Sequence, residues 1–153
     1  MEPFLESVLD CLQGLHDGFA SALTGLPPEA LDWVPGEGAN SLAVLAVHAA
    51  GAERYWIGDV IARDPSGRVR GDEFEAAGLE AAALEERLDD ALAYCRGVLE
   101  GMALADLADM RVSPRDGREF SVGWSLAHVL EHTALHLGHA QVTRQLWEQR
   151  KQP

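Results

Sequence analysis

Four segments of this 153-residue sequence place apolar side chains three or four positions apart, which is the repeat of a helix with one buried face. The predicted helices are residues 5–23, 42–62, 79–102 and 121–148. Gly25, Pro27 and Pro28 end the first helix, and Asn40 and Ser41 offer N-cap side chains to the second. Four long amphipathic helices in a chain of this length favour an all-α fold, a four-helix bundle forming one domain over residues 1–153.

The connections between these helices are polar or contain glycine and proline. Residues 28–39 are interpreted as a loop, and residues 63–75 as a polar connection. Residues 110–122 hold two short runs of alternating side chains on either side of Asp116-Gly117, which predicts a small β-hairpin. Periodicity does not say in which order the helices neighbour one another.

The chain is strongly acidic, with 25 Asp and Glu against 12 Lys and Arg and a formal charge of −13. Nucleic acid and anionic membranes are therefore not expected as partners, because both require a basic surface. No signal peptide is predicted, and no apolar run approaches the roughly 18 residues of a membrane span. A cytoplasmic protein is expected, with Cys11 and Cys95 as reduced core residues.

Four of the six histidines fall within twelve residues of the last predicted helix: His128, His132, His136 and His139. At about 100° per residue, they all share one face of that helix. Apolar residues flank this stripe, with Leu126, Val129, Leu137, Ala140 and Trp147 on one side and Leu135, Val142 and Leu146 on the other. The polar Glu131 falls on the polar side of the helix. The stripe is therefore predicted to point into the bundle.

Buried imidazoles need partners, because an unpaired buried polar group costs about 1–3 kcal/mol. A divalent cation that binds neutral ring nitrogens meets this need. His128 with His132 and His132 with His136 have the same spacing of one helical turn, so spacing alone does not choose the ligand pair. His48, at the edge of the buried face of the second helix, is the candidate third ligand, whereas His16 is interpreted as a core residue.

Two stretches of the sequence resemble the DinB-like superfamily of small bacterial helical bundles. They are residues 40–48, reading Asn-Ser-Leu-Ala-Val-Leu-Ala-Val-His, and residues 128–141, which contain the pattern H-x-x-x-H-x-G-H. Residues 32–36 and 120–124 also resemble the family. The resemblance implies a metal triad of His48, His132 and His136 that binds zinc or nickel, with His128 and His139 as its neighbours. It also implies a homodimer.

Three neutral imidazoles leave at least one coordination position open, which is typical of a catalytic metal site rather than a structural one. An open position can hold a water, whose pKa falls towards about 7, or a thiolate. The superfamily includes thiol-dependent transferases and a mycothiol-dependent maleylpyruvate isomerase, so the resemblance favours the thiolate. The expected function is metal-dependent transfer of a low-molecular-weight thiol to an electrophilic small-molecule substrate.

Other residues are weaker candidates for the site. Glu53 and Tyr55 are interpreted as rim residues, with lining the pocket as the alternative. Arg144 is interpreted as half of a surface ion pair, with binding of a substrate carboxylate as the alternative. Trp124 and Trp147 are assigned to core or interface packing, with stacking on a ligand as the alternative.

Three rival interpretations stay open. Residues 128–132 spell H-x-x-E-H, the inverted motif of zinc proteases, but the would-be base Glu131 falls on the polar side of the helix. The bundle could instead hold a metal as a non-catalytic sensor or store. In the third interpretation the histidines bond only to one another and to water. If a dimer forms, its surface is expected on an exposed apolar strip of one of the first three helices.

Overall fold

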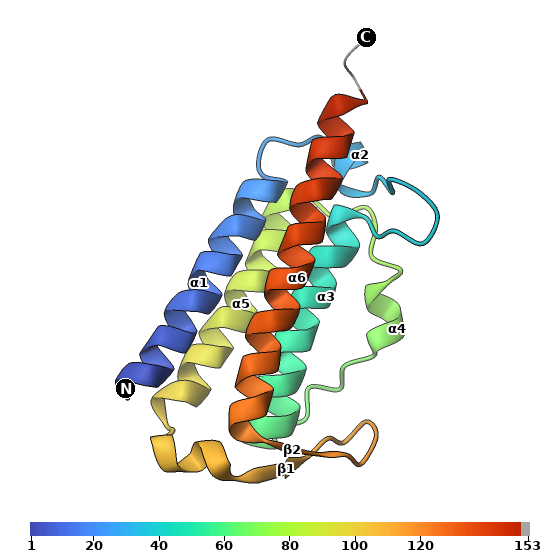
Figure 1. The fold of residues 1–153 in the computed structure, drawn as a ribbon. Helices are drawn as coiled ribbons and strands as arrows, with labels where there is room; N and C mark the ends of the chain where they lie inside the picture. The colour runs from blue at the N-terminus through green and yellow to red at the C-terminus, as the bar shows by residue number, and fades with distance from the viewer. Residues whose placement is uncertain (151–153) are drawn as a thin grey trace.

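The computed structural model describes residues 1–150, and four long helical segments make up its bundle (Figure 1). These segments are α1 (Pro3–Leu23), α3 (Leu42–Glu53) continued by the π-helix η1 (Arg54–Ala62), α5 (Ala81–Glu100) and α6 (Val122–Gln149). The connections hold α2 (Pro28–Leu31), α4 (Arg70–Glu73), the 3₁₀ helix η2 (Leu104–Ala108), β1 (Met110–Val112) and β2 (Glu119–Ser121). The predicted all-α bundle and its small hairpin are confirmed.

Serine side chains cap the two helices that carry the clustered histidines. The Oγ of Ser41 accepts a hydrogen bond from the backbone N–H of Val44 at 3.2 Å, at the start of α3. The Oγ of Ser121 accepts one from the backbone N–H of Trp124 at 3.0 Å, at the start of α6. Each cap satisfies a donor that the first turn of a helix leaves without an intrahelical partner, so both helices begin at a defined residue.

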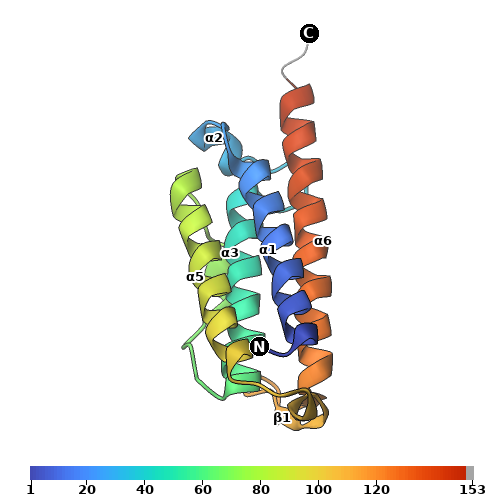
Figure 2. The same cartoon turned by 90° about the vertical axis from the view of Figure 1, so that its left-hand side faces the viewer.

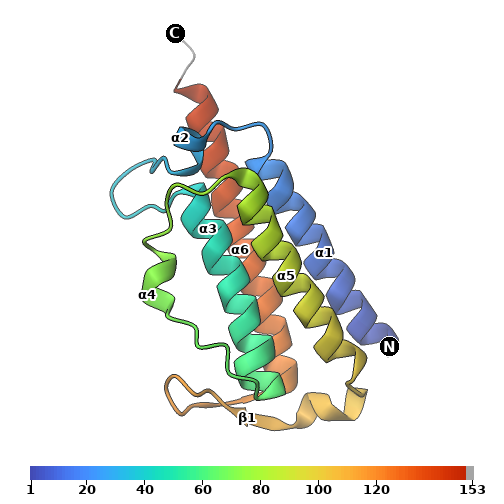
Figure 3. The ribbon, with the colours of Figure 1, turned by 180° about the vertical axis from the view of Figure 1, so that it is seen from behind.

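The helices form a ring in which α1 and α3 each pack against both α5 and α6. α1 and α6 run in one direction along the bundle and α3 and α5 in the other, as Figures 1 and 3 show. Because α3 and α5 are parallel, the chain must return along the whole bundle between them. Residues 63–80 make this return outside α3 and include α4 (Figure 3). We call this segment the crossover.

The other two connections lie at opposite ends of the bundle (Figure 2). One end carries α2, and the other carries η2 and the antiparallel pair of β1 and β2, in which Arg111 faces Phe120. Residues 28–39 are thus not all loop, because they contain the four-residue helix α2, and the connection over residues 63–75 contains another, α4. A four-residue helix is too short to show a periodic pattern, which is why the sequence did not reveal it.

The core lies on the inner faces of the four long helices. On α5 the apolar side chains spaced three or four residues apart are all buried: Leu84, Leu88, Leu92, Cys95 and Leu99. Cys11 is exposed, so its assignment to the core is wrong. Leu12 is the residue of that turn that faces the core, and its neighbour Cys11 is turned away from it by about 100°.

Only one flank of the histidine stripe on α6 is buried. The predicted core residues Leu126, Val129, Leu137, Ala140 and Trp147 are buried, but Leu135, Val142 and Leu146 are exposed. α6 packs mainly on α1 and α3, so the part of its circumference turned away from both stays open. Apart from Phe4, the large exposed apolar side chains on the long helices of residues 1–150 lie on α6, not on the first three. None of the helices described is long and apolar enough to cross a membrane.

Candidate metal centre

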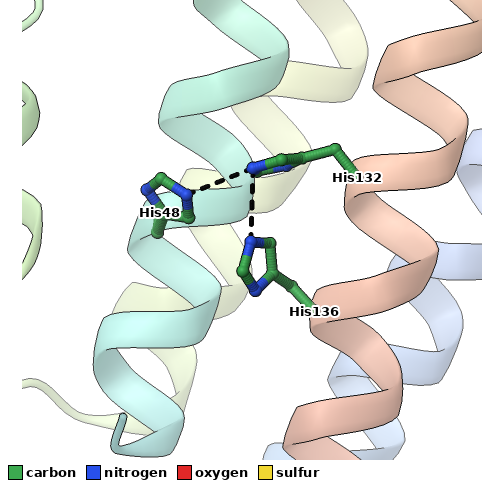
Figure 4. Close-up of side chains that lie close together, drawn as sticks. All are labelled: His48, His132 and His136. Carbon is green, nitrogen blue, oxygen red and sulfur yellow. Dashed lines mark hydrogen bonds between the residues drawn. The ribbon is translucent and has the colours of Figure 1, made fainter. Parts of the chain in front are cut away.

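Three histidines from two neighbouring helices converge on one point (Figure 4). The Nε2 atom of His132 lies 3.2 Å from the Nε2 of His48 and 3.2 Å from the Nε2 of His136. One potential ligand atom from each residue lies within 4.8 Å of the other two. His48 is buried, and His132 and His136 are half-buried. These are the three histidines predicted to form the metal triad.

The two 3.2 Å separations between ring nitrogens fit a shared first-row metal ion better than a pair of hydrogen bonds. Tetrahedral zinc bound at about 2.0–2.1 Å would place two ligand nitrogens about 3.3 Å apart. A neutral imidazole carries a single N–H, so an Nε2 proton on His132 could point at only one of its two neighbours. One of the two 3.2 Å contacts would then lack a hydrogen bond, whereas a shared cation satisfies both.

A carboxylate from the crossover sets the orientation and the tautomer of His48. The Nδ1–H of His48 donates to Oε2 of Glu73 at 2.7 Å, which leaves a lone pair on Nε2 facing the other two histidines. Arg68 in turn donates to both carboxylate oxygens of Glu73, at 2.5 and 2.8 Å. Burial acts to raise the pKa of Glu73, but the hydrogen bonds from Arg68 and His48 outweigh it and hold the pKa below its ordinary value. A charged carboxylate behind a ligand histidine is the usual support of a metal site.

Burial favours the neutral form of the two α6 histidines of the triad. Burial, reinforced by His136 and His48, lowers the pKa of His132 to about 3. Burial, reinforced by His48 and His139, lowers the pKa of His136 to about 4. The neutral imidazole is the form that binds a cation. The donor set of this chain therefore fits a divalent transition metal.

Similarity to known proteins identifies the family of this chain. A family model described as Mycothiol-S-transferase matches residues 7–149. The chain belongs to the mycothiol-S-transferase family. The resemblance to the DinB-like superfamily is thereby confirmed. No curated protein matches this member of the family.

Solved structures share its fold. A conserved protein from Enterococcus faecalis is similar with a TM-score of 0.80 at 15% identity, over 95% of this chain and 97% of that one. The mycothiol-dependent maleylpyruvate isomerase is similar with a TM-score of 0.66 at 14% identity, over 88% of this chain and 60% of the isomerase. A histidine-to-alanine variant of that isomerase gives a TM-score of 0.66 at 13% identity, with the same two coverages of 88% and 60%. At these identities the likeness shows the fold alone.

The two remaining histidines of the stripe flank the triad in this mycothiol-S-transferase family member. The ring of His128 lies 5.7 Å from that of His132 and stacks on Trp124 at 4.8 Å. The ring of His139 lies 5.7 Å from that of His136. Trp124 is 44% exposed, so it is not a core residue and lies on the surface beside the site.

The structure speaks against the zinc-protease interpretation. The side chain of Glu131 is 78% exposed, and its carboxylate lies 3.5 Å from Nδ1 of His128. It faces solvent on the outer side of α6, where it cannot serve as a general base at the triad. The His128–His132 pair that this motif requires is also not the pair that meets His48.

The structure confirms some of the interpretations given to the weaker site candidates and contradicts others. Glu53 is fully buried in the core and Tyr55 is 5% exposed, so the interpretation of both as rim residues is wrong. Arg144 forms the predicted surface ion pair, with Glu148 at 2.9 Å. Trp147 is buried, as predicted. Glu73 and Arg68 were missed because they lie in a connection without a periodic pattern, where nothing marks one carboxylate among the chain's 25 acidic residues.

Replacing Glu73 by glutamine is expected to weaken metal binding about 10- to 100-fold, because loss of the carboxylate frees the orientation and tautomer of His48. Competition with a chromophoric chelator measures this affinity. Glu75→Gln is the matched control, since Glu75 is exposed in the same connection and should leave the affinity unchanged. Equal affinities for the two variants would contradict the assigned role of Glu73.

Acid is expected to destabilise the metal-free protein between about pH 6.5 and about pH 3. The folded pKa values of His132 and His136, about 3 and about 4, lie below the ordinary value of 6.5. Above pH 6.5 neither state binds these protons, and below it the unfolded chain binds them first. The contribution of these two histidines to the free energy of unfolding is therefore fully present above pH 6.5. As the pH falls below that value, it decreases by at most about 1.4 kcal/mol per pH unit for each histidine.

Urea denaturation of the metal-free protein at a series of pH values measures this loss. Partial exposure of both rings makes the observed slope smaller than its upper limit. The double variant His132→Gln/His136→Gln is the control and should show a flatter dependence. The same pH dependence in both proteins would show that these two histidines titrate normally in the fold.

Proposed function

We propose that this protein is a metal-dependent enzyme that transfers a low-molecular-weight thiol to an electrophilic small molecule. The observation that carries the proposal is the convergence of three Nε2 atoms with a carboxylate behind His48. Three histidines leave room on the ion for an exchangeable ligand. The description of the matched family and the name of the neighbouring isomerase support a thiol as that ligand, with mycothiol as the first candidate.

His48, His132 and His136 would hold the metal, and zinc and nickel both suit three imidazoles. A bound divalent ion supplies a positive centre that favours the thiolate over the thiol. The chain's own contribution is to aim three imidazoles at one point: burial lowers the pKa values of His132 and His136 and so suppresses their protonation, and Glu73 fixes the orientation of His48. A cytoplasmic location, where small thiols are kept reduced, is part of the proposal.

In the proposed reaction, the sulfur of the thiolate forms a bond with an electrophilic carbon of the acceptor. A leaving group departs with the electron pair of the bond that breaks, and the thiol proton passes to solvent. The buried Cys95 lies in the core rather than at the triad, so the attacking thiol comes from a cosubstrate rather than from that cysteine.

The test uses the purified protein loaded with one equivalent of zinc or of nickel. Each form is mixed with 1-chloro-2,4-dinitrobenzene and, in separate reactions, mycothiol, glutathione or N-acetylcysteine. Thiol loss and the absorbance of the dinitrophenyl thioether are both followed. We expect turnover with at least one thiol and its loss on addition of a chelator. Metal binding without turnover in any combination would contradict the proposal and favour a non-catalytic sensor or store.

A further inference from the structure

A second feature beside the metal centre is a pocket of about 380 Å³ whose wall carries three arginines. Arg68 and Arg70 come from the crossover and Arg115 from the hairpin loop, and Tyr55 and Asp59 of η1 complete its polar lining. The whole chain has 25 acidic and only 12 basic side chains. A pocket lined by three guanidinium groups is therefore a local concentration of positive charge on a molecule that is acidic as a whole.

Tyr55 fixes the positions of two of these arginines. Its ring lies 5.6 Å from the guanidinium carbon of Arg68 and 5.6 Å from that of Arg115. Its hydroxyl is 2.7 Å from the Oγ of the buried Ser113 and accepts a hydrogen bond from the backbone N–H of Arg115 at 3.3 Å. The aromatic ring, held by its hydroxyl, thus lies close to two cations, one from the crossover and one from the hairpin.

The charge inside the pocket is not neutralised by its own residues. Asp59, its one lining carboxylate, is already bonded to Arg54 at 3.3 Å and to Ser66 at 3.0 and 3.1 Å. Arg70 is exposed and forms no ion pair within residues 1–150. Arg115 is also exposed, and its only carboxylate neighbour in that part of the chain is Asp116 at 3.6 Å. Two guanidinium groups remain available to an incoming anion.

Two chains of contacts connect the pocket to the triad. Arg68 donates to Glu73, which accepts from His48. The guanidinium carbon of Arg70 lies 4.8 Å from the ring centre of Phe74, which in turn lies 5.0 Å from that of His48. The positive charge of the pocket therefore lies one side chain away from the metal centre.

We propose that this pocket binds the carboxylate of a small molecule whose reacting end lies at the metal centre. Arginine recognises carboxylates through paired N–H groups, which gives orientation as well as attraction. Arg70 and Arg115 contact the anion, and Arg68 acts as a positioning residue because Glu73 occupies its N–H groups. That this molecule is a cosubstrate of thiol transfer rests on the proposed function; that the pocket binds a carboxylate does not. The carboxylate belongs to the electrophile or to the thiol.

Direct binding tests the pocket without turnover. The zinc-loaded protein is titrated with succinate and, in parallel, with its neutral analogue succinamide, and binding is followed by NMR chemical shifts. Succinate should bind at least about tenfold more tightly than succinamide, and Arg70→Gln/Arg115→Gln should lose this preference. Arg87→Gln/Arg96→Gln, with both arginines exposed on α5, is the matched control and should keep it. Equal binding of the two probes overturns the inference.

Kinetics identify which cosubstrate carries the carboxylate. In the first arm, 2-mercaptoethanol reacts with 4-chloro-3-nitrobenzoate or with 4-chloro-3-nitrobenzamide. In the second arm, 1-chloro-2,4-dinitrobenzene reacts with 3-mercaptopropionate or with 3-mercaptopropionamide. A carbon–sulfur bond forms, chloride leaves with its electron pair, and the thiol proton passes to buffer. The arginine double variant should lose at least about tenfold in kcat/KM for the charged member of one arm and little for its neutral partner.

The two proposals fail separately. Turnover without charge discrimination in either arm overturns the pocket and leaves thiol transfer standing. Succinate binding that depends on Arg70 and Arg115, in a protein that turns over no thiol, supports the pocket and overturns thiol transfer. Absence of both binding and turnover overturns both.

Discussion

Replacement of His132 by alanine is expected to weaken metal binding on the order of a thousandfold and to abolish metal-dependent thiol transfer. His132 is the centre of the triad, since its Nε2 lies 3.2 Å from those of both other histidines. A metal-binding free energy of about 12 kcal/mol shared among three ligands gives about 4 kcal/mol for each. Isothermal titration in the presence of a competing chelator measures the affinity, and metal analysis of the purified protein gives the stoichiometry.

His139→Ala is the matched control for this variant. His139 lies on the same helix and is exposed, and its ring is next to that of His136 but outside the triad. This control should retain one equivalent of metal with an affinity within about threefold of the parent. If the His132→Ala protein binds metal as tightly as the control, His132 is not a metal ligand and the triad is not a metal centre.

Replacement of Glu53 by alanine is expected to lower the free energy of unfolding by about 3–5 kcal/mol. His16 donates from Nε2 to both carboxylate oxygens of Glu53, at 2.8 and 2.9 Å, and the hydroxyl of Thr133 donates to one of them at 2.9 Å. All three side chains are buried. Truncation would leave the imidazole and the hydroxyl in the core without the acceptor they share. Urea denaturation of chelator-treated protein measures the loss.

Two further variants separate this effect from the mere removal of a charge. Glu86→Ala, at an exposed position of α5, should change stability by less than about 0.5 kcal/mol. The double variant His16→Leu/Glu53→Leu should be less destabilised than Glu53→Ala, because it removes both members of the buried pair together. A loss below about 1 kcal/mol for Glu53→Ala would mean that solvent or another group replaces the carboxylate.

The long helices and the shared face of the α6 histidines were predictable because both follow from local sequence, whereas the choice of His48, His132 and His136 as the triad came from the family resemblance. Apolar spacing fixed where α5 and α6 run, and the phase of His132 and His136 put them on one face. Phase does not say how much of a helix its neighbours cover, so Leu135 was wrongly expected on a buried flank.

The partners of buried polar groups were not predictable, because they come from distant parts of the chain. His16 was expected in the core without a named partner and Glu53 was expected at the rim, and the hydrogen bond that buries them together joins α1 to α3. Glu73 reaches His48 because α3 and α5 run in parallel and force the chain back along the bundle. Helix direction is a property of the assembled bundle, so no local pattern reports it.

The π-helix η1 gives the protein a place where substrate preference can diverge while the metal ligands stay fixed. Its wide turns, with hydrogen bonds spanning five residues instead of four, bury Tyr55, Trp56 and Ile57 in succession. His48 precedes this segment, whereas Tyr55, the residue that holds two arginines of the pocket, lies within it. Insertion or deletion of one residue between His48 and Tyr55, where α3 passes into η1, would rotate Tyr55 by about 100° about the helix axis relative to His48. Evolution could thus remodel the anion pocket separately from the ligand set.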